Sequence, residues 1–289
     1  MLFVAAAAAA VAALAAGCGA GGGKSTSSAP KNTSTALPAA DAVRLAANQT
    51  SQFKSVNAGI NMRMSGQRAV AMQGTIAMRT QPSLGMEMNI PSITANGQNL
   101  PGGMREILLA KGIYLHAQQL TSMAGKPWVF IPASTINQKT GGAFSQLSQQ
   151  VQQQDPLSSA RMLGAAENVK RIGSGSVNGV PVTRYSGTIP VQRGLSRLNS
   201  QQRAQLQQML SSMGISTVSF TAGVDQQHQI RQLTEQMNGT SERMLTTVTV
   251  TGLNQPVSIQ APPASQVGKL PASAPSSGSS SGGSAGTMG

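Results

Sequence analysis

The chain has 289 residues, of which 21 are basic and 8 are acidic, and only 3% of its residues are aromatic. Its formal net charge of +13 does not indicate nucleic-acid binding, because the basic residues are dispersed and few aromatic side chains could stack on bases. We interpret the charge as attraction to anionic lipid headgroups or acidic wall polymers beside a membrane. The single cysteine leaves no pair for an intrachain disulfide, so a hydrophobic core must stabilise the fold.

The N-terminal segment has the pattern of a bacterial lipoprotein signal. Residues 2–16 are almost wholly apolar, which suits a signal-peptide hydrophobic region and is too short for a permanent membrane helix. The residues that end at the only cysteine, Leu14-Ala15-Ala16-Gly17-Cys18, resemble a lipobox. We therefore expect a signal peptide over 1–17 and lipid attachment at Cys18, which would anchor the protein to the extracytoplasmic face of the cell membrane.

This signal departs from the usual pattern at two points. Ala15 stands three positions before the cysteine, where lipoboxes carry Leu, and no Lys or Arg precedes Lys24. The missing basic segment leads us to expect a true translation start upstream of Met1. The alternative is a small soluble protein with a hydrophobic N-terminus and an incidental cysteine, but composition and position both favour the secretory interpretation.

Two low-complexity segments bound the part of the chain that is expected to fold. Residues 19–40 are rich in Gly, Ser, Thr, Ala and Pro without periodicity, and residues 268–289 form a second such segment. Segments of this composition cannot bury enough apolar surface to fold. We therefore assign 18–40 to the lipidated cysteine and a flexible tether, 41–267 to one folded domain, and 268–289 to a disordered Gly/Ser tail.

The folded domain begins with a helical pattern near Asp41 and continues with three segments that alternate apolar and polar residues. A period of two predicts antiparallel strands with one apolar and one polar face. The apolar positions of these three strands are Ile60, Met62, Met64, Val70, Met72, Ile76, Met78, Leu84, Met86, Met88 and Ile90.

Further strands and helices are predicted along the rest of the domain. Helices are expected over 142–168, with Asp155-Pro156 at a helix start, and over 194–213. Strands are expected on both sides of the turn Lys111-Gly112, over 126–132, on both sides of the hairpin signal Asn178-Gly179, and over 216–225, 228–238, 243–253 and 256–262.

These elements predict an α+β fold: a curled antiparallel sheet of roughly ten strands, or half-open β-barrel, with helices covering its concave apolar face. We expect a ligand cavity on that face. Methionine is flexible and polarizable and suits a surface that accepts variable apolar ligands, but it also fills irregular cores, and the pattern leaves both roles open. The candidate lining residues are Ile60, Met62, Met64, Met72, Ile76, Met78, Leu84, Met86, Met88 and Leu109.

Several stretches together resemble the actinobacterial LppX/LprG-type lipoproteins of the LolA/LolB-like superfamily. Besides the lipobox and tether, they are QTSQFKSVNAGINMRMSG (49–66), GKPWVFIP (125–132), VNGVPVTRYSGTI (177–189), TVSFTAGVDQQHQIRQL (217–233) and PVSIQAPPASQV (256–267). The resemblance implies an unclosed antiparallel barrel with a helical lid and a cavity for acyl chains. It also implies a role in carrying lipidic cargo across the cell envelope.

The residue inventory gives little support to an enzyme. Among eight acidic residues and two histidines, no HExxH, CxxC or GxSxG motif occurs, so we expect no catalytic residue, metal site or cofactor. His116 is expected at a strand end and His228 at a hairpin tip. Asp225 is expected to be a turn residue rather than a catalytic acid.

Three hypotheses on function remain. The first is a carrier or chaperone that binds acyl chains of membrane lipids or glycolipids in a hydrophobic cavity, with a membrane transporter as its implied protein partner. The second is a structural envelope lipoprotein whose barrel is filled by its own side chains. The third is a sensor or accessory subunit that uses the same cavity without transporting cargo.

Overall fold

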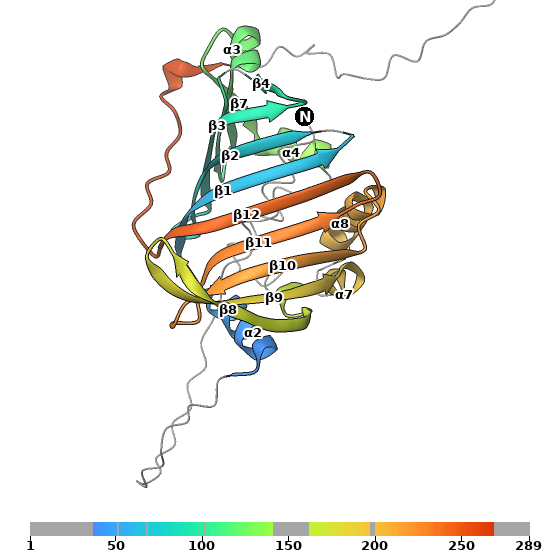
Figure 1. Ribbon diagram of the computed structural model, residues 1–289. Coiled ribbons are helices and arrows are strands. Elements are labelled where there is room, and N and C mark those ends of the chain that lie inside the picture. Colours follow the sequence, from blue (N-terminus) through green and yellow to red (C-terminus); the bar gives the residue numbers. More distant parts are fainter. Residues whose placement is uncertain are drawn as a thin grey trace, which may run out of the picture.

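The computed structural model describes residues 37–50, 52–67, 69–100, 102–140, 162–196 and 200–268. Most of these residues belong to one sheet (Figure 1). Its strands are β1 (Ser55–Gly66), β2 (Val70–Arg79), β3 (Gly85–Ala95), β4 (Gln98–Leu100), β5 (Met104–Leu109), β6 (Gly112–Ala117), β7 (Trp128–Pro132), β8 (Glu167–Val177), β9 (Val180–Pro190), β10 (Thr217–Val224), β11 (Ile230–Asn238), β12 (Glu242–Leu253) and β13 (Val267–Gly268).

The described residues form fewer helices than strands. They are α2 (Ala39–Thr50), α3 (Gln118–Ala124), α4 (Ala133–Thr140), α7 (Val191–Leu195), α8 (Ser200–Ser212) and the 3-10 turn η1 (Ala264–Gln266). No described helix has both the length and the apolar character needed to span a membrane.

The sheet is open and curled. Its strand order is β13-β7-β6-β5-β3-β2-β1-β12-β11-β10-β9-β8, with β4 paired to β3 beside this path, so β13 and β8 form two edges. Neighbouring strands pair antiparallel except for β13, which runs parallel to β7. Figure 1 shows the long strands curling around α4, α7 and α8. The expected half-open barrel with helices on its concave side is confirmed, with more strands than the ten expected.

Pairing register decides which side chains point into the curl, on the side that we call the inner face. Residues directly opposite in neighbouring strands share a face. Met62 of β1 lies opposite Met72 of β2, and Ile76 of β2 lies opposite Met88 of β3. The alternation predicted from sequence for these three strands is therefore one continuous apolar surface.

Helices cover two parts of the inner face. One hydrophobic cluster joins three helices to β10. Its buried members include Val43 of α2, Leu195 of α7, Leu210 of α8, and Val218 and Phe220 of β10. On the other half, Ala133 and Ile136 of α4 pack against the hydrophobic cluster that contains the methionines of β1–β3.

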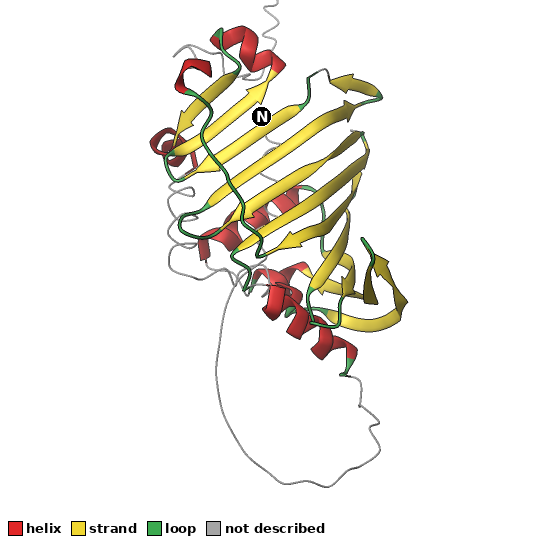
Figure 2. Ribbon diagram, turned by 90° about the vertical axis from the view of Figure 1, so that its left-hand side faces the viewer, coloured by secondary structure: helices red, strands yellow, loops and turns green. Residues whose placement is uncertain are grey.

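The segment that follows β12 corrects one prediction, because 256–262 is extended but forms no strand. Residues 254–263, which we call the strap, run across the strands as the long green loop of Figure 2. Val257 and Ile259 of the strap pack with Ile107 and Trp128 on the outer face of the sheet. Prolines at both ends of the segment lack the N–H that a strand ladder needs.

The helices predicted over 194–213 and 142–168 differ from the structure where it describes these residues. The helix expected over 194–213 is two helices, since α7 ends at Leu195 and α8 begins at Ser200. Most of the expected 142–168 helix lies outside the described residues, and β8 already begins at Glu167. Cys18, residues 19–36 of the tether and residues 269–289 of the tail also lie outside them.

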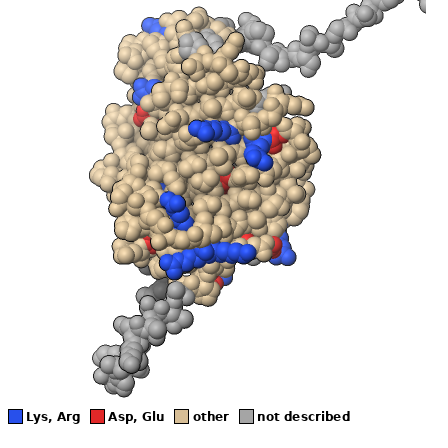
Figure 3. Space-filling model, in the orientation of Figure 1, with Lys and Arg blue, Asp and Glu red and all other residues tan. Residues whose placement is uncertain are grey.

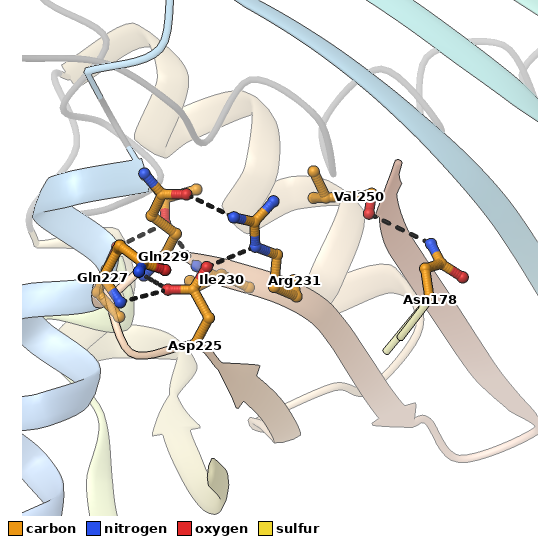
Figure 4. A network of polar contacts seen from close by, with 9 residues as sticks. Asn178, Asp225, Gln227, Gln229, Ile230, Arg231 and Val250 are labelled. Atoms are coloured by element: carbon orange, nitrogen blue, oxygen red, sulfur yellow. Dashed lines mark hydrogen bonds and ion pairs between the residues drawn. The ribbon is translucent and has the colours of Figure 1, made fainter. Parts of the chain in front are cut away.

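The hairpin between β10 and β11 is held by a buried carboxylate (Figure 4). Asp225 Oδ1 accepts hydrogen bonds from the backbone N–H groups of Gln227 and Gln229, at 2.9 and 2.8 Å. Its Oδ2 accepts from Nε of Arg231 at 2.6 Å. The side chain of Asp225 is 1% exposed, and the turn residue His228 has a φ of 57°. Asp225 and His228 therefore form a structural turn, as the sequence indicated.

The same hairpin docks helix α2. The backbone N–H of Ile230 donates to Oγ1 of Thr50 at 3.0 Å, and that hydroxyl donates to the Ala46 carbonyl at 2.6 Å. One buried hydroxyl thus joins the last turn of α2 to the start of β11.

We predict that Asp225→Ala lowers the free energy of unfolding by about 3 kcal/mol, because it leaves two turn N–H groups and the largely buried side chain of Arg231 without the carboxylate acceptor. Chemical denaturation monitored by circular dichroism measures the change. The control is Asp41→Ala, whose ion pair with Arg44 is exposed on both sides and should contribute less than about 1 kcal/mol. Equal effects of the two substitutions would contradict this account of the hairpin.

Candidate functional site

The candidate site is the apolar inner face of β1, β2, β3 and β5. Nine of the ten lining residues predicted from sequence are buried, each no more than 8% exposed. Eight of them belong to a single hydrophobic cluster, which we call the methionine cluster. They are Ile60, Met62, Met72, Ile76, Met78, Leu84, Met86 and Met88. The ninth, Met64, lies at the end of β1 opposite Val70 and Met244, which pack against the same cluster.

The tenth predicted residue, Leu109, does not belong to this site. It packs on the outer face with Ile107, Trp128 and Ile259. Its neighbour Leu108 takes the inward position and joins the methionine cluster opposite Met86. Both faces of β5 are covered at this end of the sheet, so apolar residues occupy inward and outward positions alike. The apolar–polar alternation that identifies the inward residues of the other strands is therefore absent here.

One acidic residue, Glu106 of β5, stands on the inner face beside members of the methionine cluster. Met88 of β3 and Leu115 of β6 flank it in register, and Met104 and Leu108 lie two residues away on the same face. Glu106 is 2% exposed, and its Oε2 has no hydrogen-bond partner among the described residues. Burial raises the pKa of Glu106 to about 7, because the low-dielectric surroundings disfavour the charged form.

A second polar spot lies across the sheet. Glu235 of β11 is opposite Thr246 of β12 on one side and Phe220 of β10 on the other, and Thr246 is in turn opposite Met62. Thr246 is 6% exposed, whereas Glu235 is only partly buried. Desolvation of its carboxyl raises the pKa of Glu235. The inner face is thus apolar with two acidic points.

Glu106 is one of the chain's eight acidic residues, and no motif in the sequence singles it out. The signal that could have placed it is its position in MREILL, where it shares parity with Met104 and Leu108. That parity alone does not say which face is inward, because Ile107 and Leu109 make the opposite face equally apolar. The register of β5 with β3 resolves the ambiguity.

The outer face carries grooves beneath the strap. One of about 400 Å³ lies between the strap and β3, β5 and β7, where the Arg105 guanidinium stands 5.4 Å from the Trp128 ring centre and 2.8 Å from Glu87. Another of about 620 Å³ lies where the strap leaves β12, and there Arg79 donates to the Ile259 carbonyl. Both grooves have mixed polar and apolar linings and contain groups that already pair with each other.

Charged groups are scattered over the surface. Figure 3 shows single basic side chains separated by uncharged surface, with few acidic ones beside them.

The ring Nδ1–H of His116 donates to the Pro127 carbonyl, 2.6 Å away, at the end of β6. Within the described ranges, no three His, Cys, Asp or Glu side chains come together as a metal-binding group.

Comparison with known proteins gives partial matches. No protein-family model matches the chain. Over 115 residues it is 30% identical to an uncharacterized 31.2 kDa protein of Streptomyces griseus from the rplA–rplJ intergenic region, and this segment spans 38% of the chain and 37% of that protein.

Among solved structures, the chain resembles lipoprotein LppX of Mycobacterium tuberculosis, at 16% identity and a TM-score of 0.45, over 77% of this chain and 98% of LppX. It also resembles LprF of Mycobacterium bovis, at 13% identity and a TM-score of 0.46, over 78% of this chain and 96% of LprF. A LolA superfamily protein of Nitrosomonas europaea matches at 6% identity and a TM-score of 0.27, over 77% and 96%.

We predict that the stability of the protein depends on pH through Glu106. A folded-state pKa of about 7, against an ordinary value of 4.5, means that the folded protein holds this proton more tightly than the unfolded chain. Stability from this group is therefore present below about pH 4.5 and is lost as pH rises to about 7, by about 3 kcal/mol in all.

Urea denaturation of the wild type and Glu106→Gln between pH 4.5 and 8 measures this loss, and the difference between the two curves isolates Glu106. The control Glu242→Gln changes a partly exposed carboxyl at the start of β12 and should leave the slope as in the wild type. A Glu106→Gln curve parallel to that of the wild type would refute the prediction.

Proposed function

We propose that this chain is a cell-envelope lipoprotein that binds acyl chains of a lipid or glycolipid on the inner face of its curled sheet, as a carrier or chaperone. The observation that carries the proposal is that six methionines of β1–β3 share that face and are buried. Flexible thioether side chains can adapt to apolar ligands of different shape. The strands pair through backbone hydrogen bonds, which do not depend on the conformation of these side chains.

The energetics of such binding are favourable. Burial of each CH₂ group contributes about 0.8 kcal/mol, so an acyl chain of about sixteen carbons, such as palmitate, would gain on the order of 12 kcal/mol. The bilayer offers the chain a similar gain. Exchange between the membrane and an apolar inner face therefore requires no energy source, only a surface comparable to the bilayer interior.

The proposed place of action is the extracytoplasmic face of the cell membrane. Acylation of Cys18 would anchor the protein there, and the tether would separate the folded domain from the membrane. The dispersed basic side chains would attract anionic headgroups. A carrier of this kind would deliver cargo to or from a membrane transporter. This assignment rests on the sequence pattern of the N-terminal segment.

A second candidate is a structural, sensor or accessory lipoprotein with a filled core and no transported cargo. Its supporting observation is the packing of Ala133 and Ile136 of α4 against the methionine cluster, whose members are each no more than 8% exposed. In that case the methionines would fill an irregular core. The two candidates differ in what happens when one of these positions is enlarged.

We predict that Met72→Trp and Met86→Trp abolish binding of a fluorescent fatty-acyl probe without lowering the melting temperature. The indole would occupy space that cargo needs, while strand pairing survives. Probe titration and thermal unfolding of the domain measure both quantities. Ala71→Trp is the matched control, because it places the same side chain on the exposed outer face of β2.

A filled core gives the opposite result. There the indole would overpack the cluster and cost about 1–3 kcal/mol of stability. Lost stability in both variants, together with no probe binding by the unmutated domain, would rule out the carrier.

A separate prediction concerns anchoring. Cys18→Ala should leave the protein unprocessed in the membrane or release it, because stable attachment needs two or more acyl chains on that residue. Detergent phase partition and the apparent mass of the expressed protein report this, with Ser25→Ala in the tether as a control. An alanine variant that still behaves as the mature lipoprotein would contradict the assignment of Cys18.

A further inference from the structure

One buried carboxyl oxygen beside the methionine cluster, Oε2 of Glu106, receives no hydrogen bond from the described residues. Glu106 projects to the inner face between Met88 and Leu115, is 2% exposed, and has no hydrogen-bond partner at Oε2 among the described residues. A polar atom buried in this way is costly, and buried polar side chains in proteins nearly always have a partner. An apolar residue of the same size would fit the surrounding cluster without that cost.

We propose that Glu106 is the recognition group of the lipid site and that its missing partner is an uncharged hydroxyl carried by the ligand's apolar part. This inference rests on the proposed function, since it requires a ligand on the inner face. It narrows the ligand from any acyl chain to an amphiphile that brings a hydroxyl into the methionine cluster.

The surroundings of Glu106 favour a hydroxyl over a charged group. The inward residues of the strands on both sides are uncharged, namely Met86, Met88 and Ile90 of β3 and Ile113 and Leu115 of β6. Burial raises the pKa of the carboxyl and so stabilises its neutral form. A neutral carboxyl both donates and accepts a hydrogen bond, as does a hydroxyl, so the two groups can satisfy each other.

Charged alternatives fit less well. An ammonium group would have to lose its hydration and ionise Glu106 inside an apolar cluster, where the desolvation of both ions opposes their attraction. A carboxylate would offer no donor to Oε2 and would be desolvated in the same way.

The test uses ligands of one chain length that differ in a single group. Diphenylhexatriene, which has no polar atom, is bound to the protein and displaced by dodecanol or by dodecyl methyl ether, which keeps the oxygen but lacks the donor. Dodecylammonium and laurate are the charged ligands of the series, one cationic and one anionic. Each series is run with the wild type, Glu106→Gln, Glu106→Leu and the outer-face control Glu87→Gln.

We expect the ratio of dodecanol to ether affinity to be about tenfold higher in the wild type than in Glu106→Leu, which corresponds to about 1.4 kcal/mol. Glu106→Gln should keep the preference, because an amide also donates and accepts. Glu87→Gln should match the wild type. Thermal melting checks that Glu106→Leu folds, and Glu106→Met replaces it if it does not.

The outcomes separate the inference from the proposed function. If the wild type binds neither diphenylhexatriene nor any dodecyl ligand, the lipid site itself is refuted. If it binds them but the alcohol-to-ether ratio is the same with and without Glu106, the lipid site stands and the recognition role of Glu106 is refuted. If dodecylammonium is the ligand whose affinity is lost in Glu106→Leu, the site selects a cation and the hydroxyl assignment is overturned.

Discussion

The pairing register of β12, β1, β2, β3 and β5 is the constraint on which the rest of this structure depends. Side chains alternate with a period of two, so a slip of one residue would turn every inward side chain of a strand outward. In β2 such a slip would expose Met72 and place the polar Gln73 inside. The apolar alternation and the turns select this register. The backbone hydrogen bonds that hold the paired strands do not depend on the exact shape of the side chains. The strands can therefore be rigid while the methionine surface that they display stays adaptable.

The same alternation explains how far the sequence predicts the site. In β1 and β2 the outward positions are polar or small, as at Arg63, Gln73 and Ala77, so the larger inward set is visible from the sequence alone. At the end of β5 the outer face is covered by the strap, and Ile107, Leu108 and Leu109 are all apolar. Local pattern then shows that the segment is buried on both faces but not which residue belongs to which face. Leu109 was misplaced for this reason, and only the pairing with β3 assigns Glu106 to the inside.

Non-local contacts account for the other differences. The strap alternates Val257 and Ile259 with polar residues as a strand would, and both apolar side chains are indeed packed on the sheet. Its direction across the strands is set by contacts far away in sequence, such as the hydrogen bond from Arg79 to the Ile259 carbonyl. The Asp225 turn was visible from its residue types. The turn also brings the N–H of Ile230 to Thr50 and so docks α2. This second role cannot be read from the sequence, because the two residues are far apart along the chain.

An apolar inner face supplies affinity but little selectivity, because burial of CH₂ groups is non-directional and a chain can slide along methionines with little change in contact. Only directional groups can fix where a ligand sits, and few polar groups stand on this face. Glu106 lies within the methionine cluster, while Glu235 and Thr246 lie beyond β1 on the other side. An acidic residue in such a cluster lowers the stability of the folded protein near neutral pH, where its ordinary charged form is disfavoured. A hydroxyl that satisfies the carboxyl would offset this cost only in the bound state. The destabilising residue then becomes a source of selectivity, because ligands without that hydroxyl leave the cost in place.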